Sequence, residues 1–134
     1  DLNNTNFTSV DGILFSKDKK ELHQYPIGKV SQTYTITDNT TTIKEGSFQY
    51  SSLQSITITD TITTIENNAF SDCLPLNEVK YIYDKEPSER GYDIFTNTPL
   101  LQSIKVPKNY ESEKFCNKHV SKELLVGKCG QNVR

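Results

Sequence analysis

A near-repeat of about twenty residues constrains this chain more than any other feature of its sequence. The segment TITDNTTTIKEGSF at residues 35–48 is followed by TITDTITTIENNAF at residues 57–70. Apolar and aromatic side chains recur in register with these copies, in columns that contain Ile36, Ile58, Tyr81 and Val106, and Phe48, Phe70 and Phe95. A period in the twenties is typical of a solenoid, in which each repeat forms one coil.

Within a coil, residues 53–59 alternate between apolar and polar side chains. Ile56 and Ile58 point to one side and Thr57 to the other, which predicts a short strand with one buried face. One coil buries about six large apolar groups, worth roughly 9–18 kcal/mol in total. Ordering its backbone costs on the order of 20–40 kcal/mol. A single coil therefore cannot fold alone, and the coils must stack.

Composition narrows the functional classes. The 134 residues are 34% hydrophobic with a mean hydropathy of −0.61, which favours one domain with a thin core. A net charge of −2 and a pI near 5.7 argue against a nucleic-acid binder. No apolar run is long enough for a membrane span. The first residue is Asp1 and methionine is absent, so we expect a processed protein or an excised fragment.

The segment TITDTITTIENNAFSDCLPLNEV resembles the leucine-rich repeat of the BspA-like (Treponema pallidum-type) class. The usual coil of that class reads roughly I-x-I-P-x-x-V-x-x-I-x-x-x-A-F-x-x-C-x-x-L-x-x-I. The matching positions are Ile58, Ile62, Ile65, Ala69, Phe70, Cys73, Leu76 and Val79. An earlier coil matches less fully, with Thr40 and Ser47 at apolar positions. Residues 10–26 look like the hairpin of these proteins, and residues 104–116 like their closing strand and cap.

The resemblance implies a right-handed, strand-dominated leucine-rich-repeat solenoid that forms a single domain. We expect a β-hairpin at residues 10–30, about three coils at residues 33–106, and a C-terminal cap and tail at residues 107–134. Asn109 is placed to begin a short cap helix, with Phe115 as its inward anchor. The third coil carries an insertion of two to three residues and lacks the cysteine.

Function in a solenoid usually lies on the broad surface that stacking creates. The residues expected on the exposed strand face are Thr35, Ser55, Thr57, Glu78, Lys80, Ile82, Ser103 and Lys105. The resemblance implies a non-enzymatic, extracellular adhesion module of a cell-surface protein, whose anchor is not in this chain. Its partner would be a host-cell or matrix protein, or a glycan. The alternative is a spacer or terminal fragment of a longer repeat array without a ligand of its own.

Other candidate sites are weaker. Cys73 falls in an inward column and predicts a buried thiol. Cys116 and Cys129 could form a disulfide in an oxidising compartment, which the spacing leaves open. The run CNKH supplies only half a metal site, so we expect no metal or cofactor. Three sequons begin at Asn3, Asn6 and Asn39.

Bare strand edges at the N-terminal end of a solenoid are prone to pair with another chain. They predict weak association between copies of this chain.

Overall fold

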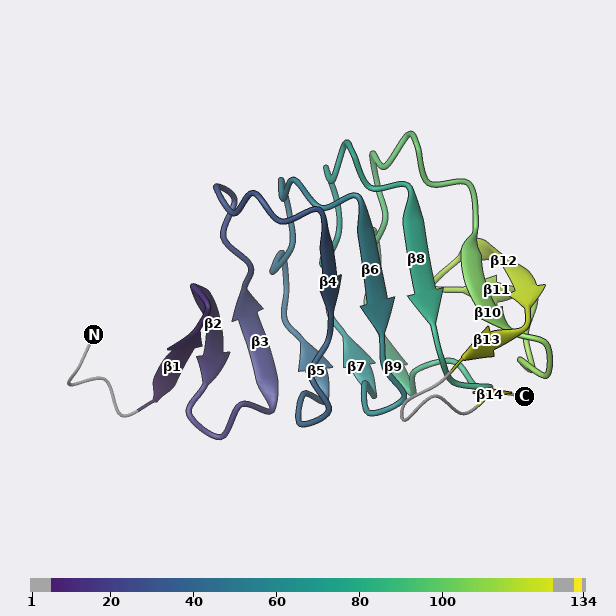
Figure 1. Cartoon of the computed structure of the whole chain (residues 1–134), viewed down its shortest axis with the longest axis horizontal. Coiled ribbons are helices and arrows are strands. Elements are labelled where there is room, and N and C mark those ends of the chain that lie inside the picture. The colour runs from purple at the N-terminus through teal and green to yellow at the C-terminus, as the bar shows by residue number, and fades with distance from the viewer. Residues whose placement is uncertain (1–5, 127–131, 134) are drawn as a thin grey trace.

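The structure is a computed structural model that describes residues 6–126 and 132–133. These residues form strands joined by short turns, and none of them lies in a helix. The strand-dominated solenoid predicted from the repeat is confirmed. Two six-stranded sheets face one another along the molecule, and each coil contributes one strand to each sheet (Figure 1).

The first sheet lies partly behind the second in Figure 1 and extends beyond it at the N-terminal end. Its strands, in spatial order, are β1 (Phe7–Val10), β2 (Ile13–Ser16), β3 (Glu21–Gln24), β5 (Thr42–Ile43), β7 (Thr64–Ile65) and β9 (Glu89–Arg90). The second sheet contains, in spatial order, β11 (Lys114–Phe115), β12 (Lys118–Glu123), β10 (Ile104–Pro107), β8 (Glu78–Tyr81), β6 (Ser55–Ile58) and β4 (Thr33–Thr35). A separate pair joins β13 (Leu125–Val126) to β14 (Asn132–Val133).

The strands of successive coils pair in parallel, and their register follows the repeat. In the second sheet, Thr57 lies opposite Thr35 on one side and Lys80 on the other. In the first sheet, Ile43 lies opposite Ile65. Equivalent positions of the repeat therefore stack directly above one another, and each column keeps its chemical character along the solenoid.

An aromatic column runs through the core between the two sheets. Phe70 stacks on Phe48 with ring centroids 4.8 Å apart, and on Phe95 at 5.3 Å. Tyr25 continues the stack from Phe48 at 5.2 Å, and Phe115 closes the other end at 6.2 Å from Phe95. All five rings are at most 7% exposed. The column supplies packing contacts that no coil could make alone.

The turns between the two sheets repeat as well. One turn position in each coil has a left-handed backbone, with φ of 64° at Gly46, 60° at Asn68 and 55° at Asp93. A second left-handed position holds Tyr50, Asp72 and Asn97. Glycine and asparagine adopt this conformation at low cost, so backbone geometry explains why Gly46 and Asn68 stand at this turn position.

Two polar residues occupy apolar positions of the repeat, and both are fully buried. The Thr40 hydroxyl lies 2.9 Å from the Thr37 hydroxyl, so it has a hydrogen-bond partner. The Ser47 hydroxyl has no such partner among the described residues, and the equivalent position of the next coil is Ala69. A buried hydroxyl without a partner lowers stability, so Ser47 suits this position less well than the alanine of the next coil.

The N-terminal hairpin folds as predicted and gains a third strand. The two strands of the hairpin are β2 and β3, and β1 pairs antiparallel with β2. The turn between β1 and β2 contains Asp11 at φ 51° and Gly12 at φ 82°. An Asp-Gly pair with positive φ at both residues is the preferred two-residue hairpin turn.

The predicted cap helix is wrong. Residues 114–123 form the hairpin of β11 and β12 instead, and Asn109 lies in a turn after β10. Cys116 at φ 48° and Asn117 at φ 66° form the two-residue turn of this hairpin, and a right-handed helix cannot continue through positive φ. Phe115 is nevertheless the fully buried anchor that was expected.

The insertion in the third coil supports this hairpin. The Tyr81 hydroxyl donates to the carbonyl of Lys85 at 2.8 Å, and Glu111 N donates to the carbonyl of Asp84, also at 2.8 Å. The Glu86 carboxylate accepts a hydrogen bond from Cys116 N at 3.3 Å. The extra residues therefore connect the last regular coil to the cap.

Gly91 allows two coils to approach closely. A Cβ atom at this position would lie 2.3 Å from Asn67 Oδ1 and 2.5 Å from Asn67 N. We predict that Gly91→Ala lowers the free energy of unfolding by about 2 kcal/mol or more, measured by urea unfolding. The matched control is Gly28→Ala, because a Cβ there meets nothing within 4 Å. Equal effects of the two substitutions would contradict the prediction.

Candidate interaction face

Of the residues predicted for the strand face, Thr35, Ser55, Thr57, Glu78, Lys80 and Lys105 lie in strands of the second sheet, on the surface opposite its buried residues. Ser103 directly precedes β10. We call this surface the strand face and define it by Thr35, Ser55, Thr57, Glu78, Lys80, Ser103 and Lys105. Strand pairing places Thr35, Thr57, Lys80 and Lys105 in one row across β4, β6, β8 and β10. Ser55 and Glu78 are paired in the adjacent row. The structure thus brings these residues together as the repeat predicts, while their role in binding remains a prediction.

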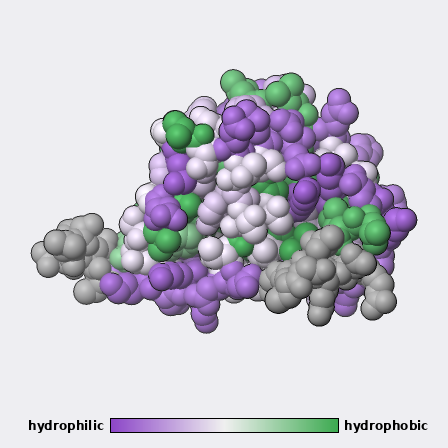
Figure 2. Space-filling view, in the orientation of Figure 1, coloured by the Kyte–Doolittle hydropathy of each residue, from purple (hydrophilic) through white to green (hydrophobic). Residues whose placement is uncertain are grey.

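The strand face has a weakly polar half and a charged half. Thr33 and Thr35 of β4 are exposed, and Ser55 and Thr57 of β6 are partly exposed. Figure 2 shows pale, weakly polar residues over the middle of this view, with strongly hydrophilic residues beside them. The charged half begins at β8. A ligand that covers the face would therefore contact hydroxyl groups over β4 and β6 and charged groups over β8 and β10.

Glu78 organises the charged half. Its carboxylate accepts a hydrogen bond from Lys105 Nζ at 2.7 Å and from the Ser55 hydroxyl at 2.9 Å. Lys80 Nζ lies 3.9 Å away. The hydrogen bond from Lys105, followed by that from Ser55, lowers the pKa of Glu78. Both lysines that were expected to face a ligand are therefore already paired with a carboxylate of the same chain.

The expectation that Ile82 is exposed is wrong, since only 9% of the residue is accessible. Strand pairing between β6 and β8 ends at Ile58 and Tyr81. Beyond that pair the chain enters the insertion, and Ile82 N donates to the carbonyl of Ile58 at 3.1 Å. The alternation that would have turned Ile82 outward stops one residue earlier. Tyr83 is the exposed aromatic residue here, at 40%.

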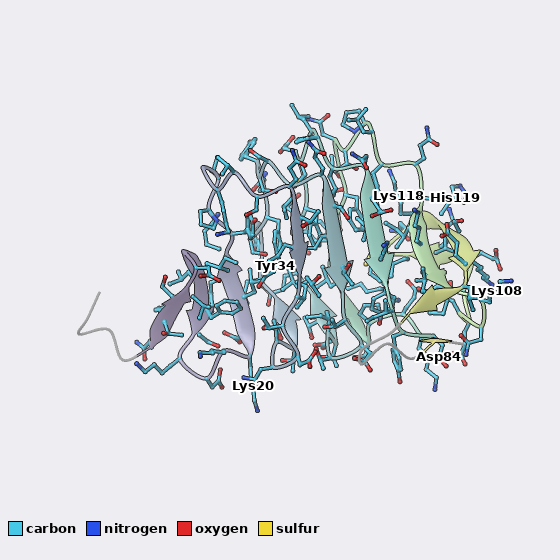
Figure 3. The ribbon with its side chains drawn as sticks, in the orientation of Figure 1. Lys20, Tyr34, Asp84, Lys108, Lys118 and His119 are labelled. Atoms are coloured by element: carbon cyan, nitrogen blue, oxygen red, sulfur yellow. The ribbon has the colours of Figure 1, made fainter. Side chains whose placement is uncertain are left out.

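Strand β12 extends the strand face beyond the residues found by sequence reasoning. Ser121 lies opposite Lys105, so it continues the row of Thr57 and Lys80. Its hydroxyl donates to the Glu123 carboxylate at 3.0 Å. Figure 3 shows Lys118 and His119 at this end of the sheet. This strand was not predicted, because a helix was expected in the cap. The apolar Val120 between polar neighbours, which is partly buried against the core, was a signal for a strand.

Two predictions concern the cysteines: a buried thiol at Cys73 and a disulfide between Cys116 and Cys129. Cys73 is 1% exposed, as predicted, and its thiol donates to the carbonyl of Phe48 at 3.0 Å. Burial raises its pKa. Cys116 lies in the hairpin turn, where burial and the nearby Glu86 raise its pKa to about 12. Cys129 lies outside the described residues, so the Cys116–Cys129 disulfide stays a prediction.

The sequons differ in their surroundings. Asn39 lies in an exposed turn, but its side-chain amide donates to the carbonyl of Asp18 at 2.8 Å, and the neighbouring Thr40 is buried. Asn6 is exposed beside β1, and Asn3 lies outside the described residues. Use of these sequons for glycosylation remains a prediction.

No group of three or more His, Cys, Asp or Glu residues in the described part of the chain is arranged to hold a metal ion. Within the same residues, no helix is long and apolar enough to cross a membrane. The hollows are shallow. One of about 330 Å³ is lined by residues that include Glu66, Glu89 and Arg90, and one of about 210 Å³ lies between the third coil and the cap hairpin.

The repeat pattern of the BspA type leucine rich repeat region, in 6 copies, matches residues 27–122. The chain belongs to this family. The family pattern thus spans the three regular coils, β10, and the hairpin up to β12. A search of curated proteins gives no significant match.

Two solved structures are similar to this BspA-type repeat chain. The pneumococcal vaccine antigen PcpA is 26% identical with a TM-score of 0.65, and the similarity covers 85% of this chain and 34% of PcpA. A leucine-rich repeat protein from Eubacterium ventriosum is 25% identical with a TM-score of 0.72, over 87% of this chain and 31% of that protein. This chain therefore spans about a third of the length of either protein.

The pairing of Glu78 predicts a pH dependence of stability. Because its pKa is lower in the folded state, the ionised carboxylate stabilises the fold above its unfolded pKa of roughly 4.3. That stability is lost as the pH falls through the lower, folded-state pKa. We predict that Glu78→Gln flattens the fall in unfolding free energy between about pH 5 and pH 2. The difference should be about 1 kcal/mol or less, because solvent screens the cluster.

Urea unfolding of both proteins across this pH range measures the effect. Identical pH profiles would contradict the assignment of Glu78 as a stabilising carboxylate.

Proposed function

We propose that this chain is a non-enzymatic recognition module of an extracellular, cell-surface protein, and that it binds a protein partner through the strand face. The observation that carries this proposal is the row of Thr57, Lys80 and Lys105, which strand pairing holds in register across a rigid sheet. Leucine-rich repeats generally mediate protein–protein interaction, and one similar structure is a vaccine antigen. The first finding supports a partner-binding role, and the second supports a cell-surface location.

The chemistry of the strand face favours a partner with acidic and hydrogen-bonding groups. The hydroxyls of Ser55 and Thr57 can donate or accept hydrogen bonds. Lys80 and Lys105 supply two positive charges whose present partner is the single carboxylate of Glu78. An acidic partner would compete with Glu78 for these lysines, so Glu78 would limit its affinity. A host-cell or matrix protein, or an acidic glycan, could supply such groups.

The alternative function is a spacer or terminal fragment of a longer repeat array. Two observations favour it. The lysines are already satisfied within the chain, and the strand face lacks an exposed large aromatic anchor of the kind that dominates protein interfaces. Large exposed apolar side chains lie instead in turns, at Tyr50, Leu74, Tyr92 and Leu100.

A charge-reversal experiment separates the two functions. The variant Lys80→Glu/Lys105→Glu should lose saturable binding to the matrix protein, host-cell surface or glycan that the unmodified chain binds. The variant Glu78→Gln, which frees both lysines, should bind an acidic partner more tightly. Surface plasmon resonance against a panel of these ligands provides the measurement.

The matched control is Lys17→Glu/Lys20→Glu, which changes the net charge equally at exposed residues in the turn between β2 and β3 of the first sheet. It should bind like the unmodified chain, and a thermal melt checks that each variant is folded. Equal loss in both double variants would indicate a non-specific charge effect. No binding by the unmodified chain at micromolar concentration would favour the spacer.

A further inference from the structure

Strand β4 is the N-terminal edge of the second sheet, and it pairs with β6 on one side only. Ile36 N, directly after β4, donates to Thr57 O of β6 at 3.0 Å. Because backbone groups alternate between the two sides of a strand, the N–H and carbonyl groups of Thr33 and Thr35 point away from β6. No described residue donates to, or accepts from, these four backbone groups.

The N-terminal hairpin replaces only part of the coil that would precede β4. Between regular coils, Thr63 N donates to Thr41 O at 2.9 Å, and Thr41 N donates in the same way to Lys20 O at 2.8 Å. The turn between β2 and β3 therefore stands in for the turn of a preceding coil. The hairpin strands join the first sheet, and β1, β2 and β3 extend beyond β4 at this end of the molecule (Figure 1). The second sheet thus lacks the strand that would match them.

The columns of the repeat define the kind of strand that fits this position. In β4 and β6, the outward positions hold the hydroxyl residues Thr33, Thr35, Ser55 and Thr57, and the inward positions hold Tyr34, Ile56 and Ile58. Since equivalent positions stack, a strand with the same alternation would continue both kinds of row. Neither a charged residue nor a proline, which usually protect an edge, is present in β4.

Apolar surface lies next to this open edge. Tyr34 packs on Tyr25 with ring centroids 5.4 Å apart, and it stays partly exposed at the end of the core. The loop that leads from β3 into β4 carries Ile27 and Val30, which are 56% and 91% exposed. An inward aliphatic side chain of an added strand would cover the open side of Tyr34. Apolar burial would then add to the main-chain hydrogen bonds that hold such a strand.

A second copy of this chain suits the edge less well than a single extended segment. If two β4 strands paired about a two-fold axis, the first sheet of each copy would need the space where β1, β2 and β3 of the other copy lie (Figure 1). The opposite edge of the second sheet, β11, has only two residues, and Lys114 there is exposed. A charged residue on an edge strand disfavours pairing with another strand.

We propose that β4 binds an extended segment of another protein, which adds to the second sheet as a parallel strand. The segment carries hydroxyl residues at its outward positions and aliphatic residues at its inward positions, as β6 does. In the register of the repeat, its backbone accepts hydrogen bonds from Thr33 N and Thr35 N and donates to the carbonyls of the same two residues. This site uses neither Lys80 nor Lys105.

A capped peptide of residues 52–60, SLQSITITD, is the probe, because it has the alternation of β6. In an NMR titration of the isotope-labelled chain, it should bind saturably with a Kd of roughly 10 µM to 1 mM. Amide exchange at Thr33 and Thr35 should slow when the peptide binds. The Lys80→Glu/Lys105→Glu variant should bind the peptide equally well, which separates this site from the lysines of the strand face.

The variant Thr35→Pro removes one outward N–H and leaves the hydrogen bonds of β4 to β6, because proline is tolerated at a strand edge that faces solvent. It should not bind the peptide, whereas the control Thr35→Val, which keeps the N–H, should bind it. A thermal melt checks that both variants are folded. Binding of the peptide by folded Thr35→Pro would overturn the proposal.

N-methylated peptides provide a second test that does not depend on folding of a variant. In β6, the inward Ile58 bonds toward the following coil, since its carbonyl accepts from Ile82 N at 3.1 Å. The inward residues of a parallel strand before β4 would bond to β4 in the same way. A peptide N-methylated at the position of Ile56 should therefore not bind, and one N-methylated at the position of Thr57 should bind normally.

The reverse result for the two methylated peptides would overturn the parallel strand. Absence of binding up to about 1 mM peptide would overturn the proposal. It would also be overturned if exchange at Thr33 and Thr35 slowed with the concentration of the chain alone, because a second copy would then occupy the edge.

Discussion

Stacking of equivalent residues in successive coils is the interaction on which the rest of this structure depends. The aromatic column from Tyr25 to Phe115 occupies the core, and backbone hydrogen bonds between coils run beside it. Neither could form within one coil. Since the short strands of the first sheet have only two residues in each regular coil, they have little stability except as part of the stack. The surface chemistry is therefore fixed by the stack.

The same constraint explains the form of the candidate site. Strict register places Thr57, Lys80 and Lys105 in one row, and it also places Glu78 where both lysines reach it. A repeat protein of this kind presents rows of side chains, and its recognition depends on how neighbouring rows interact. Glu78 thus pairs both lysines within the chain, and under the proposed function it would compete with an acidic partner for them.

The features that recur in every coil could be predicted from the sequence, and the features that occur only once could not. The columns of Ile58 and Phe70 predicted the coils and the strand face, because equivalent positions in a stack must share their burial. The cap was predicted from local helix signals such as Asn109, and these were overridden by the positive φ at Cys116 and Asn117 and by pairing of β12 with β10. Ile82 was wrongly predicted to be exposed because the strand ends at Tyr81, where the insertion begins. The other coils lack this insertion, so comparison of the repeats could not show where the alternation ends.

A shared aromatic column makes the coils of this solenoid fold as one unit. Urea unfolding and native-state hydrogen exchange of Phe70→Ala test it most directly. We predict a loss of about 3–5 kcal/mol in unfolding free energy, with protection reduced in β4, β6 and β8 alike. A loss below about 1 kcal/mol, or reduced protection confined to the coil that contains Phe70, would contradict it.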